Sequence, residues 1–171
     1  MGFNNIAGTP TGNGNFGLDP AGNSGQTVFG FASRATGNVS FASGYRNTAS
    51  GTASVAMGNY NYSTGDSSIA IGKESYAQGA SSIAIGFKAH AGGDGSVALG
   101  QENVSWGSTN FTSGYQNIAG DVTAARGTGG SAVAMGKYNQ ATADASMALN
   151  RATKATNQGA TSMGLGTTAD N

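Results

Sequence analysis

Three ring-bearing side chains recur every fourteen residues in the middle of the chain, Tyr62, Tyr76 and His90, and Trp106 follows close to the next point of the series. Aromatic side chains gathered on an exposed face are typical of protein-binding surfaces. The alternative is structural, because β-strands favour aromatic residues whatever their role. We predict that these four residues form an outward-facing ligand-binding stripe. In it, His90 serves as a member of the stripe rather than as a metal ligand or a base.

The other chemistry-bearing residues do not form a catalytic set. No carboxylate pair, Ser/His/Asp set or histidine cluster stands out, and the chain has no cysteine. Residues 12–17 formally match G-x-G-x-x-G, but no predicted strand followed by a helix surrounds them. We therefore expect no enzyme activity, no cofactor and no metal site.

The spacing of fourteen residues extends along most of the chain. One column of glycines repeats at this period without a slip: Gly30, Gly44, Gly58, Gly72, Gly86, Gly100 and Gly114. After eight inserted residues the repeat resumes at Gly136, continues at Asn150 and, with two further inserted residues, ends at Gly166. A repeat this short leaves room for two strands and two turns per coil, and not for a helix.

The columns of the repeat define the faces of each strand. With the repeated glycine as position zero, −3 and −1 hold bulky apolar residues, −4 is mostly serine and −2 mostly alanine. Because side chains alternate across a strand, one face is bulky and the other small. A second short strand directs the small residue at +5 inward and the residue at +4 outward. The sequence predicts an all-β, parallel β-roll with a thin interior, forming a single domain over residues 1–171.

The bulky columns form a continuous apolar face that nothing else in the chain could cover. Soluble monomers rarely expose such a patch, so we expect self-association about a common axis. The residues predicted to form the core of this oligomer, which is the trimer core if the subunits number three, are Val55, Met57, Ile69, Ile71, Ile83, Ile85, Val97, Leu99, Val133 and Met135.

Composition excludes several other classes. Thirty glycines and only 9% charged residues leave too few large aliphatic side chains for a thick core. Eight Lys and Arg balance eight Asp and Glu, so no nucleic acid and no anionic membrane is expected as a partner. Without a long apolar run or a signal peptide, the chain is expected to be an excised segment that does not contact a membrane.

Some positions depart from the uniform columns. The segments around 9–26 and 121–130 break the period, and we expect loops there, which often carry recognition. Position +3 is often asparagine, which we assign to tight turns because asparagine tolerates left-handed backbone. Position +2 includes Glu74, Lys88 and Glu102, an alternating-charge row expected to keep the turn solvated.

The repeat S-[VI]-A-[IML]-G-x-x-[SN]-x-A-x-G resembles the YadA-like head of trimeric autotransporter adhesins. The best-matching units are Ser54–Gly65, Ser67–Gly79, Ser82–Gly93 and Ser96–Gly107. The resemblance implies a left-handed, homotrimeric β-roll at the tip of a surface fibre. It also implies attachment to host matrix proteins such as collagen, fibronectin or laminin, or to cell-surface glycans. The implied location is the cell surface, with outer-membrane anchoring through regions absent from this chain.

A collagen-linked motif of that family, N-S-V-A-I-G-x-x-S, has its nearest counterpart in Ser67, Ser68 and Ser75 with the strand between them. No unit matches the motif fully, since Ser67 replaces its asparagine and the next unit has Ala89 in place of the final serine. These serines are therefore either ligand-binding residues or residues that set the fold. The function predicted is a host-binding adhesin head. The alternative is a purely structural trimeric fibre segment, such as an adhesin spacer or a phage tail fibre, with no ligand of its own.

Overall fold

Two parallel β-sheets, joined coil by coil, make up the protein in a computed structural model that describes residues 6–7, 25–122 and 130–170. Each coil contributes a five-residue strand to one sheet and a two-residue strand to the other. The ten long strands are β2 (Thr27–Phe31), β4 (Phe41–Tyr45), β6 (Val55–Asn59), β8 (Ile69–Lys73), β10 (Ile83–Phe87), β12 (Val97–Gln101), β14 (Phe111–Tyr115), β16 (Val133–Lys137), β18 (Met147–Arg151) and β20 (Thr161–Leu165). The eleven short strands are β1 (Ile6–Ala7), β3 (Arg34–Ala35), β5 (Thr48–Ala49), β7 (Tyr62–Ser63), β9 (Tyr76–Ala77), β11 (His90–Ala91), β13 (Val104–Ser105), β15 (Ile118–Ala119), β17 (Gln140–Ala141), β19 (Lys154–Ala155) and β21 (Thr168–Ala169).

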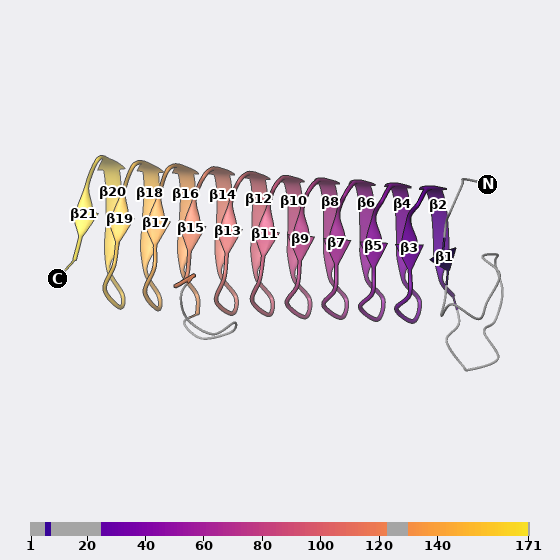
Figure 1. The fold of residues 1–171 in the computed structure, drawn as a ribbon. Coiled ribbons are helices and arrows are strands. Elements are labelled where there is room, and N and C mark those ends of the chain that lie inside the picture. Colours follow the sequence, from indigo (N-terminus) through magenta and orange to yellow (C-terminus); the bar gives the residue numbers. More distant parts are fainter. Residues whose placement is uncertain (1–5, 8–24, 123–129, 171) are drawn as a thin grey trace.

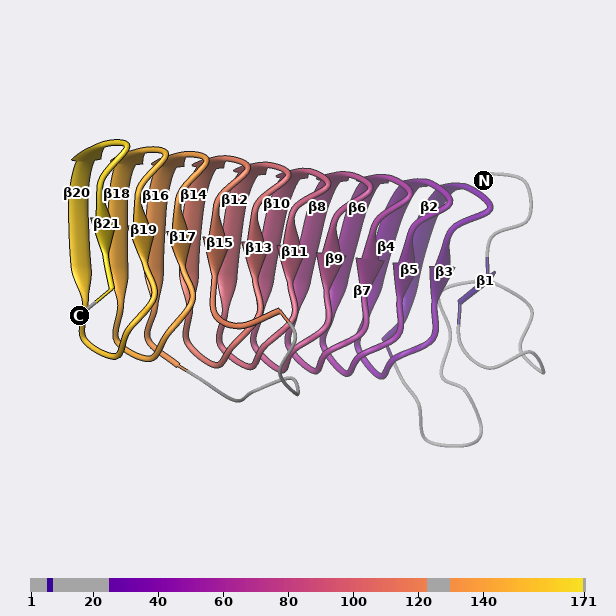
Figure 2. The ribbon, with the colours of Figure 1, turned by 60° about the vertical axis from the view of Figure 1, so that its left-hand side comes forward.

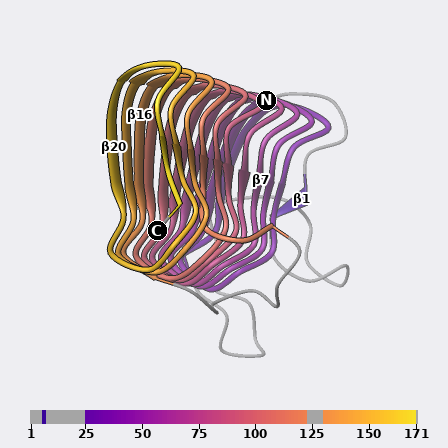
Figure 3. The same cartoon turned by 90° about the vertical axis from the view of Figure 1, so that its left-hand side faces the viewer.

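The coils stack along one axis, with long strand on long strand and short strand on short strand (Figure 1). Equivalent residues pair directly, so that Ala84 lies between Ala70 and Ala98. The short strands lie over the sheet of long strands (Figure 2). Viewed from the C-terminal end, the chain ascends β20, crosses the top and descends as β21 while approaching the viewer (Figure 3). This clockwise path makes the solenoid left-handed. The predicted all-β, parallel β-roll with coils of about fourteen residues is confirmed.

The interior between the sheets is as thin as the columns predict. Alanines at −2 and +5, such as Ala70 and Ala77, have no exposed surface. The serine at −4, as in Ser68, is equally buried. Small side chains on both sheets let them approach closely, and they leave no room between the sheets for a helix or a thick core. No helix occurs among the described residues, so none there could cross a membrane.

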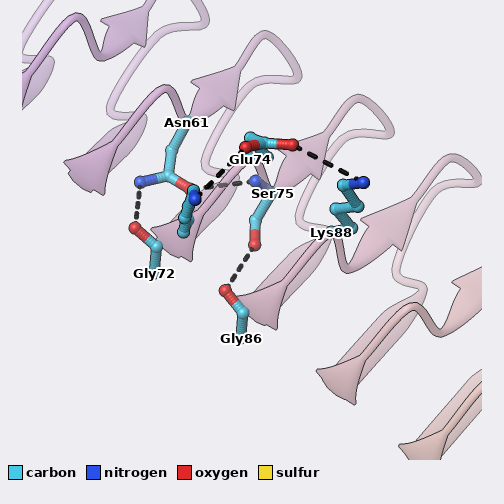
Figure 4. A network of polar contacts seen from close by, with 7 residues as sticks. Asn61, Gly72, Glu74, Ser75, Gly86 and Lys88 are labelled. Atoms are coloured by element: carbon cyan, nitrogen blue, oxygen red, sulfur yellow. Dashed lines mark hydrogen bonds and ion pairs between the residues drawn. The ribbon is translucent and has the colours of Figure 1, made fainter.

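Asparagines at +3 form a buried ladder that joins neighbouring coils. The Asn61 side-chain nitrogen donates to the carbonyl of Gly72 at 2.7 Å, and its oxygen accepts the backbone N–H of Ser75 at 2.9 Å (Figure 4). The same nitrogen also donates to the carbonyl of Met57 at 2.7 Å. Ser75 continues the ladder by donating its hydroxyl to the carbonyl of Gly86 at 3.0 Å. These contacts satisfy backbone groups where each long strand ends and its hydrogen-bonding pattern breaks.

The predicted left-handed backbone at these asparagines is wrong. The positive φ angles lie at the preceding position, +2, as at Glu74 (φ 55°) and Lys88 (φ 54°). This backbone turn directs the +2 side chain outward and the +3 side chain into the coil. The asparagine is structural, as expected, but it acts through its amide hydrogen bonds.

Two glycine columns are required by the close approach of neighbouring coils. At Gly72, φ is +122° and a Cβ atom would lie 2.0 Å from the carbonyl oxygen of Gly86. At Gly79, in the opposite turn, a Cβ atom would lie 2.1 Å from the oxygen of Gly93. Asn150 replaces the zero-position glycine in one coil and keeps a positive φ of 94°.

The last coil corrects the predicted register. β20 pairs with β18 so that Gly164, and not Gly166, faces Asn150. No residues are inserted before it, because the spacing is the usual fourteen. The interior decides this register, since it places the small Ser162 at the buried −2 position and leaves Met163 and Leu165 exposed.

The predicted loops lie largely outside the described residues, which omit 8–24 and 123–129. The flanking coils still stack directly. β1 pairs with β3, so that Ile6 is paired with Arg34. β14 pairs with β16 despite the eight extra residues between them, so that Gly114 is paired with Gly136. The second insertion therefore leaves the register of the solenoid unchanged.

Candidate binding surfaces

The four residues of the predicted stripe, which we call the outer stripe, lie side by side on the short-strand sheet. The rings of Tyr62 and Tyr76 stack almost parallel, with centroids 5.1 Å apart. Tyr76 also meets His90 at 5.8 Å, and His90 meets Trp106 edge-on at 5.2 Å. Tyr76 is the most open of the four, with 38% of its surface exposed. The structure thus brings together all four sequence-predicted residues in one continuous row.

The Trp106 end of the outer stripe rests on a glycine that the sequence analysis did not single out. A Cβ atom on Gly92 would lie 2.6 Å from Cε3 of Trp106, so the indole covers the space where a side chain would be. Beside it, Nε2 of His90 lies 3.2 Å from the Gln78 side-chain oxygen. The stripe therefore combines an apolar ring surface with a polar group at its margin.

The three serines of the collagen-linked motif lie in different environments. Ser67 is exposed in a turn with φ 56°, whereas Ser68 and Ser75 are fully buried. The Ser68 hydroxyl donates to the carbonyl of Gly65 at 2.6 Å, and Ser75 belongs to the buried ladder. A ligand could reach Ser68 or Ser75 only if the coil opened.

The long-strand sheet exposes the bulky columns, which we call the apolar face (positions −3 and −1). None of the ten predicted trimer-core residues is buried within one chain. Met57 and Ile85 are each 38% exposed and Met135 is 43% exposed, whereas the alanines between them are fully buried. One sheet face is thus closed within the chain, and the other is an apolar surface that the described residues leave partly or fully exposed.

A third surface is the first-turn edge (positions +1 and +2), which lies at the end of each long strand; the sequence analysis identified its charge row at +2 but not the rings and cations at +1. The Arg46 guanidinium lies over the rings of Tyr45 and Tyr60, at 5.4 and 5.5 Å. Lys73 and Lys88 lie over Phe87 at 5.5 and 5.1 Å. These cation–π contacts arise where a cation and a ring occupy the same turn or equivalent turns of adjacent coils.

A cation–π contact of the same kind occurs in the C-terminal half of the chain. Lys137 lies over the rings of Tyr115 and Tyr138, at 5.2 and 4.9 Å. Desolvation, a hydrogen bond with Tyr138 and the nearby charge of Glu102 raise the pKa of Tyr115 above its usual range. In the alternating-charge row, Lys88 lies 3.9 Å from Glu74 (Figure 4), while Glu102 accepts a hydrogen bond from Gln116.

The acidic and histidine side chains do not gather into a metal-binding group in the part of the chain that the structure describes. Within residues 6–7, 25–122 and 130–170, no three His, Cys, Asp or Glu side chains gather where a metal ion could bind.

The fold defines the protein as a repeat-built parallel β-solenoid. A family model described as the YadA head domain repeat matches residues 35–61, 49–75, 77–103 and 128–149, more than half of the chain together. The chain belongs to the YadA head family. Heads of this family are adhesin-type structural domains, in general homotrimeric and exposed on the cell surface, and they are not a known enzyme family. No match to the chain is found among curated proteins.

Proposed function

We propose that this chain is a head segment of a trimeric autotransporter adhesin that attaches to host matrix proteins or cell-surface glycans. Three copies pack their apolar faces together about a common axis. Each copy then presents its outer stripe to the surroundings. The protein is held at the cell surface by outer-membrane anchoring outside this chain.

The apolar face carries this proposal. Half-exposed Met57, Ile85 and Met135 lie in two columns that run the length of the long-strand sheet. Burying such side chains releases about 25 cal/mol for each Å² removed from water, so covering the whole face strongly favours association. Self-association covers the face with the same columns, and a cyclic arrangement also leaves the short-strand sheets pointing outward.

The outer stripe supports the binding part of the proposal. It gathers Tyr62, Tyr76, His90 and Trp106 on a sheet whose other outward positions are mostly threonine, serine, glutamine and charged residues. Repetition of one stripe on three subunits permits multivalent attachment through individually weak contacts. Ser67, exposed beside the long strands, adds a further contact to this proposal, whereas Ser68 and Ser75 maintain the coil.

The second candidate function is a structural fibre segment without a ligand. The close stacking of Tyr62 on Tyr76 favours it, because cross-strand ring pairs also stabilise a sheet on their own account.

Sedimentation velocity and a binding screen separate the two functions. We expect a trimer that binds at least one of collagen, fibronectin, laminin or an arrayed glycan, and we expect Tyr76→Ala to weaken that binding. A stable trimer that binds none of them identifies the fibre segment. A folded monomer contradicts both functions.

A further inference from the structure

Charged side chains are sorted between the two edges of the flattened coil. The exposed cations of the first-turn edge are Arg46, Lys73, Lys88, Lys137 and Arg151. The opposite edge, positions +7, +8 and −5, which we call the second-turn edge, carries exposed aspartates at +8: Asp66, Asp94 and Asp144. A chain with no net charge therefore has a basic edge and an acidic edge.

The two glutamates of the first-turn edge are already engaged within the chain. Glu74 lies 3.7 Å from Lys73 and 3.9 Å from Lys88, and Glu102 accepts a hydrogen bond from Gln116. Four of the cations, Arg46, Lys73, Lys88 and Lys137, are in turn held against the rings described above. The basic edge is thus ordered before any partner arrives, which lowers the entropic cost of docking.

The acidic edge is ordered as well. One carboxylate oxygen of Asp66 accepts the backbone N–H of Thr52, and Asp94 accepts that of Ala80, each at 2.8 Å. Asp144 accepts the N–H of Gly130 in the same way. Each of these carboxylates is anchored by the preceding coil and remains exposed to a partner.

The edges also match in their apolar residues, coil by coil. Val39 on the second-turn edge is 58% exposed, and its coil lies between Phe31 and Tyr45, which are 41% and 37% exposed on the first-turn edge. Val122 is 47% exposed and lies on the second-turn edge, between the coil that contains Tyr115 and the next coil. That next coil carries Tyr138, which is 43% exposed on the first-turn edge.

Aspartates on the second-turn edge also lie at the same levels along the solenoid axis as cations on the first-turn edge. Asp144 lies in the step between the coils of Lys137 and Arg151, and Asp66 lies in the step between the coils of Tyr60 and Lys73. At each of these heights an acid on one edge corresponds to a cation on the other edge.

We propose that the first-turn edge of each subunit docks on the second-turn edge of the next copy of the chain, base against acid and ring against valine. This inference rests on the proposed trimer. When three long-strand sheets face a threefold axis, the end of one long strand approaches the start of the next subunit's strand, so unlike edges meet. The edge contacts set the rotation and the axial register of the subunits, which the uniform apolar face leaves undetermined.

Disulfide cross-linking tests which edges meet, and the chain has no cysteine of its own. Lys73→Cys marks the first-turn edge, and Ala80→Cys marks the second-turn edge of the same coil; both side chains are exposed. Within one chain these sites lie on opposite edges of the coil, which are apart by about the length of a long strand, about 17 Å, and this exceeds the reach of a disulfide. Under mild oxidation we expect the double variant to form covalent trimers and each single variant to stay uncross-linked.

Several results would overturn the docking of unlike edges. Dimers from either single variant would show that like edges meet. A double variant that remains uncross-linked while sedimenting as a trimer would leave the proposed trimer standing and remove the edge contact. If that trimer is also retained on a sulfated-polysaccharide column, a polyanion is the better occupant of the basic edge. A monomeric unmodified chain would instead remove the trimer and this inference with it.

Charge reversal gives an independent readout. We expect the combined Lys137→Glu and Arg151→Glu changes to raise the concentration of half-dissociation of the trimer roughly tenfold at low salt, and Asp144→Lys to restore part of the loss. Lys154→Glu is the matched control, because Lys154 is exposed on the short-strand sheet, and it should have no effect. Equal effects of the control and the edge variants would contradict the proposal.

Discussion

The two sheets of the solenoid come from the same repeat, but their outward faces differ in uniformity. The apolar face keeps bulky apolar residues in nearly every coil, from Phe41 to Met147. The outward column of the short-strand sheet instead changes along the axis from Arg34 through Tyr76 to Lys154. A uniform face suits a partner with the same repeat, whereas a varied face can distinguish one ligand from another. This difference supports the proposal that the long-strand sheet serves assembly and the short-strand sheet serves recognition.

The largest expected effect comes from the apolar face. Replacing Ile71 and Ile85 with Asp places carboxylates in the proposed subunit contact, and desolvating each costs several kcal/mol. We expect the trimer to dissociate, as measured by sedimentation equilibrium. Tyr76→Ala is the matched change on the other sheet and should leave the trimer intact. If both variants assemble equally well, the division between the sheets is wrong.

The next largest effect comes from the interior that the two sheets share. Asn61→Ala removes the donor to Met57 and Gly72 and the acceptor for the Ser75 N–H. Leaving buried polar groups unsatisfied costs about 1–3 kcal/mol each, so the midpoint of chemical denaturation should fall clearly. Because the ladder lies within one chain, the trimer should not dissociate at denaturant concentrations below the unfolding midpoint of the variant. Early dissociation would show that the ladder also shapes the subunit contact.

A smaller effect is expected from the outer stripe itself. Tyr76→Ala removes the stacking on Tyr62 and the contact with His90, each worth about 0.5–1.5 kcal/mol. Thermal unfolding followed by circular dichroism should show a modest loss of stability, together with weaker ligand binding. Thr48→Ala, in the same column outside the stripe, is the control for binding. An unchanged affinity in Tyr76→Ala would leave the stripe with a structural role alone.

The smallest effect is expected at the margin of the stripe. Gly92→Ala introduces a methyl group within 2.6 Å of Trp106, and the ring must move. Stability should change by less than about 1 kcal/mol, because the ring can swing outward and alanine restricts the unfolded chain. Trp106 is the single tryptophan, so its fluorescence reports the shift directly. An unaltered spectrum would mean that the indole does not rest on Gly92 in solution.

Most of the fold could be predicted from the sequence, because each feature repeats in a column. The glycine period fixed the coil length, and the alternation of Ala70 and Ile71 identified the inner and outer sides of the strand. The last coil was misread because the apolar Met163 and Leu165 suggested a shifted register. The narrow interior outweighs that signal, since only the small Ser162 fits inside.

The surfaces were predicted less completely, for reasons that lie in the turns. The charge row that contains Glu74 was expected to face solvent, but alternation does not extend through a turn, so the sequence did not show that Ser75 points inward. The rings and cations of the first-turn edge were not predicted because position +1 varies among phenylalanine, tyrosine, asparagine, lysine, glutamine, arginine and leucine. A usable signal was present: Lys73 and Phe87 stand fourteen residues apart, which places a cation beside a ring on adjacent coils.

The in-register stacking of coils has a consequence for how the gene can change. Residues 67–72 and 81–86 have the same sequence, SSIAIG, and occupy equivalent positions in neighbouring coils. Recombination between the corresponding DNA segments would delete residues 73–86, join Gly72 to Phe87 and restore every pairing around the junction. The product would be shorter by one coil, about 4.8 Å. Unequal crossing-over can therefore lengthen or shorten this solenoid in whole coils, and selection can adjust its reach without redesigning its core.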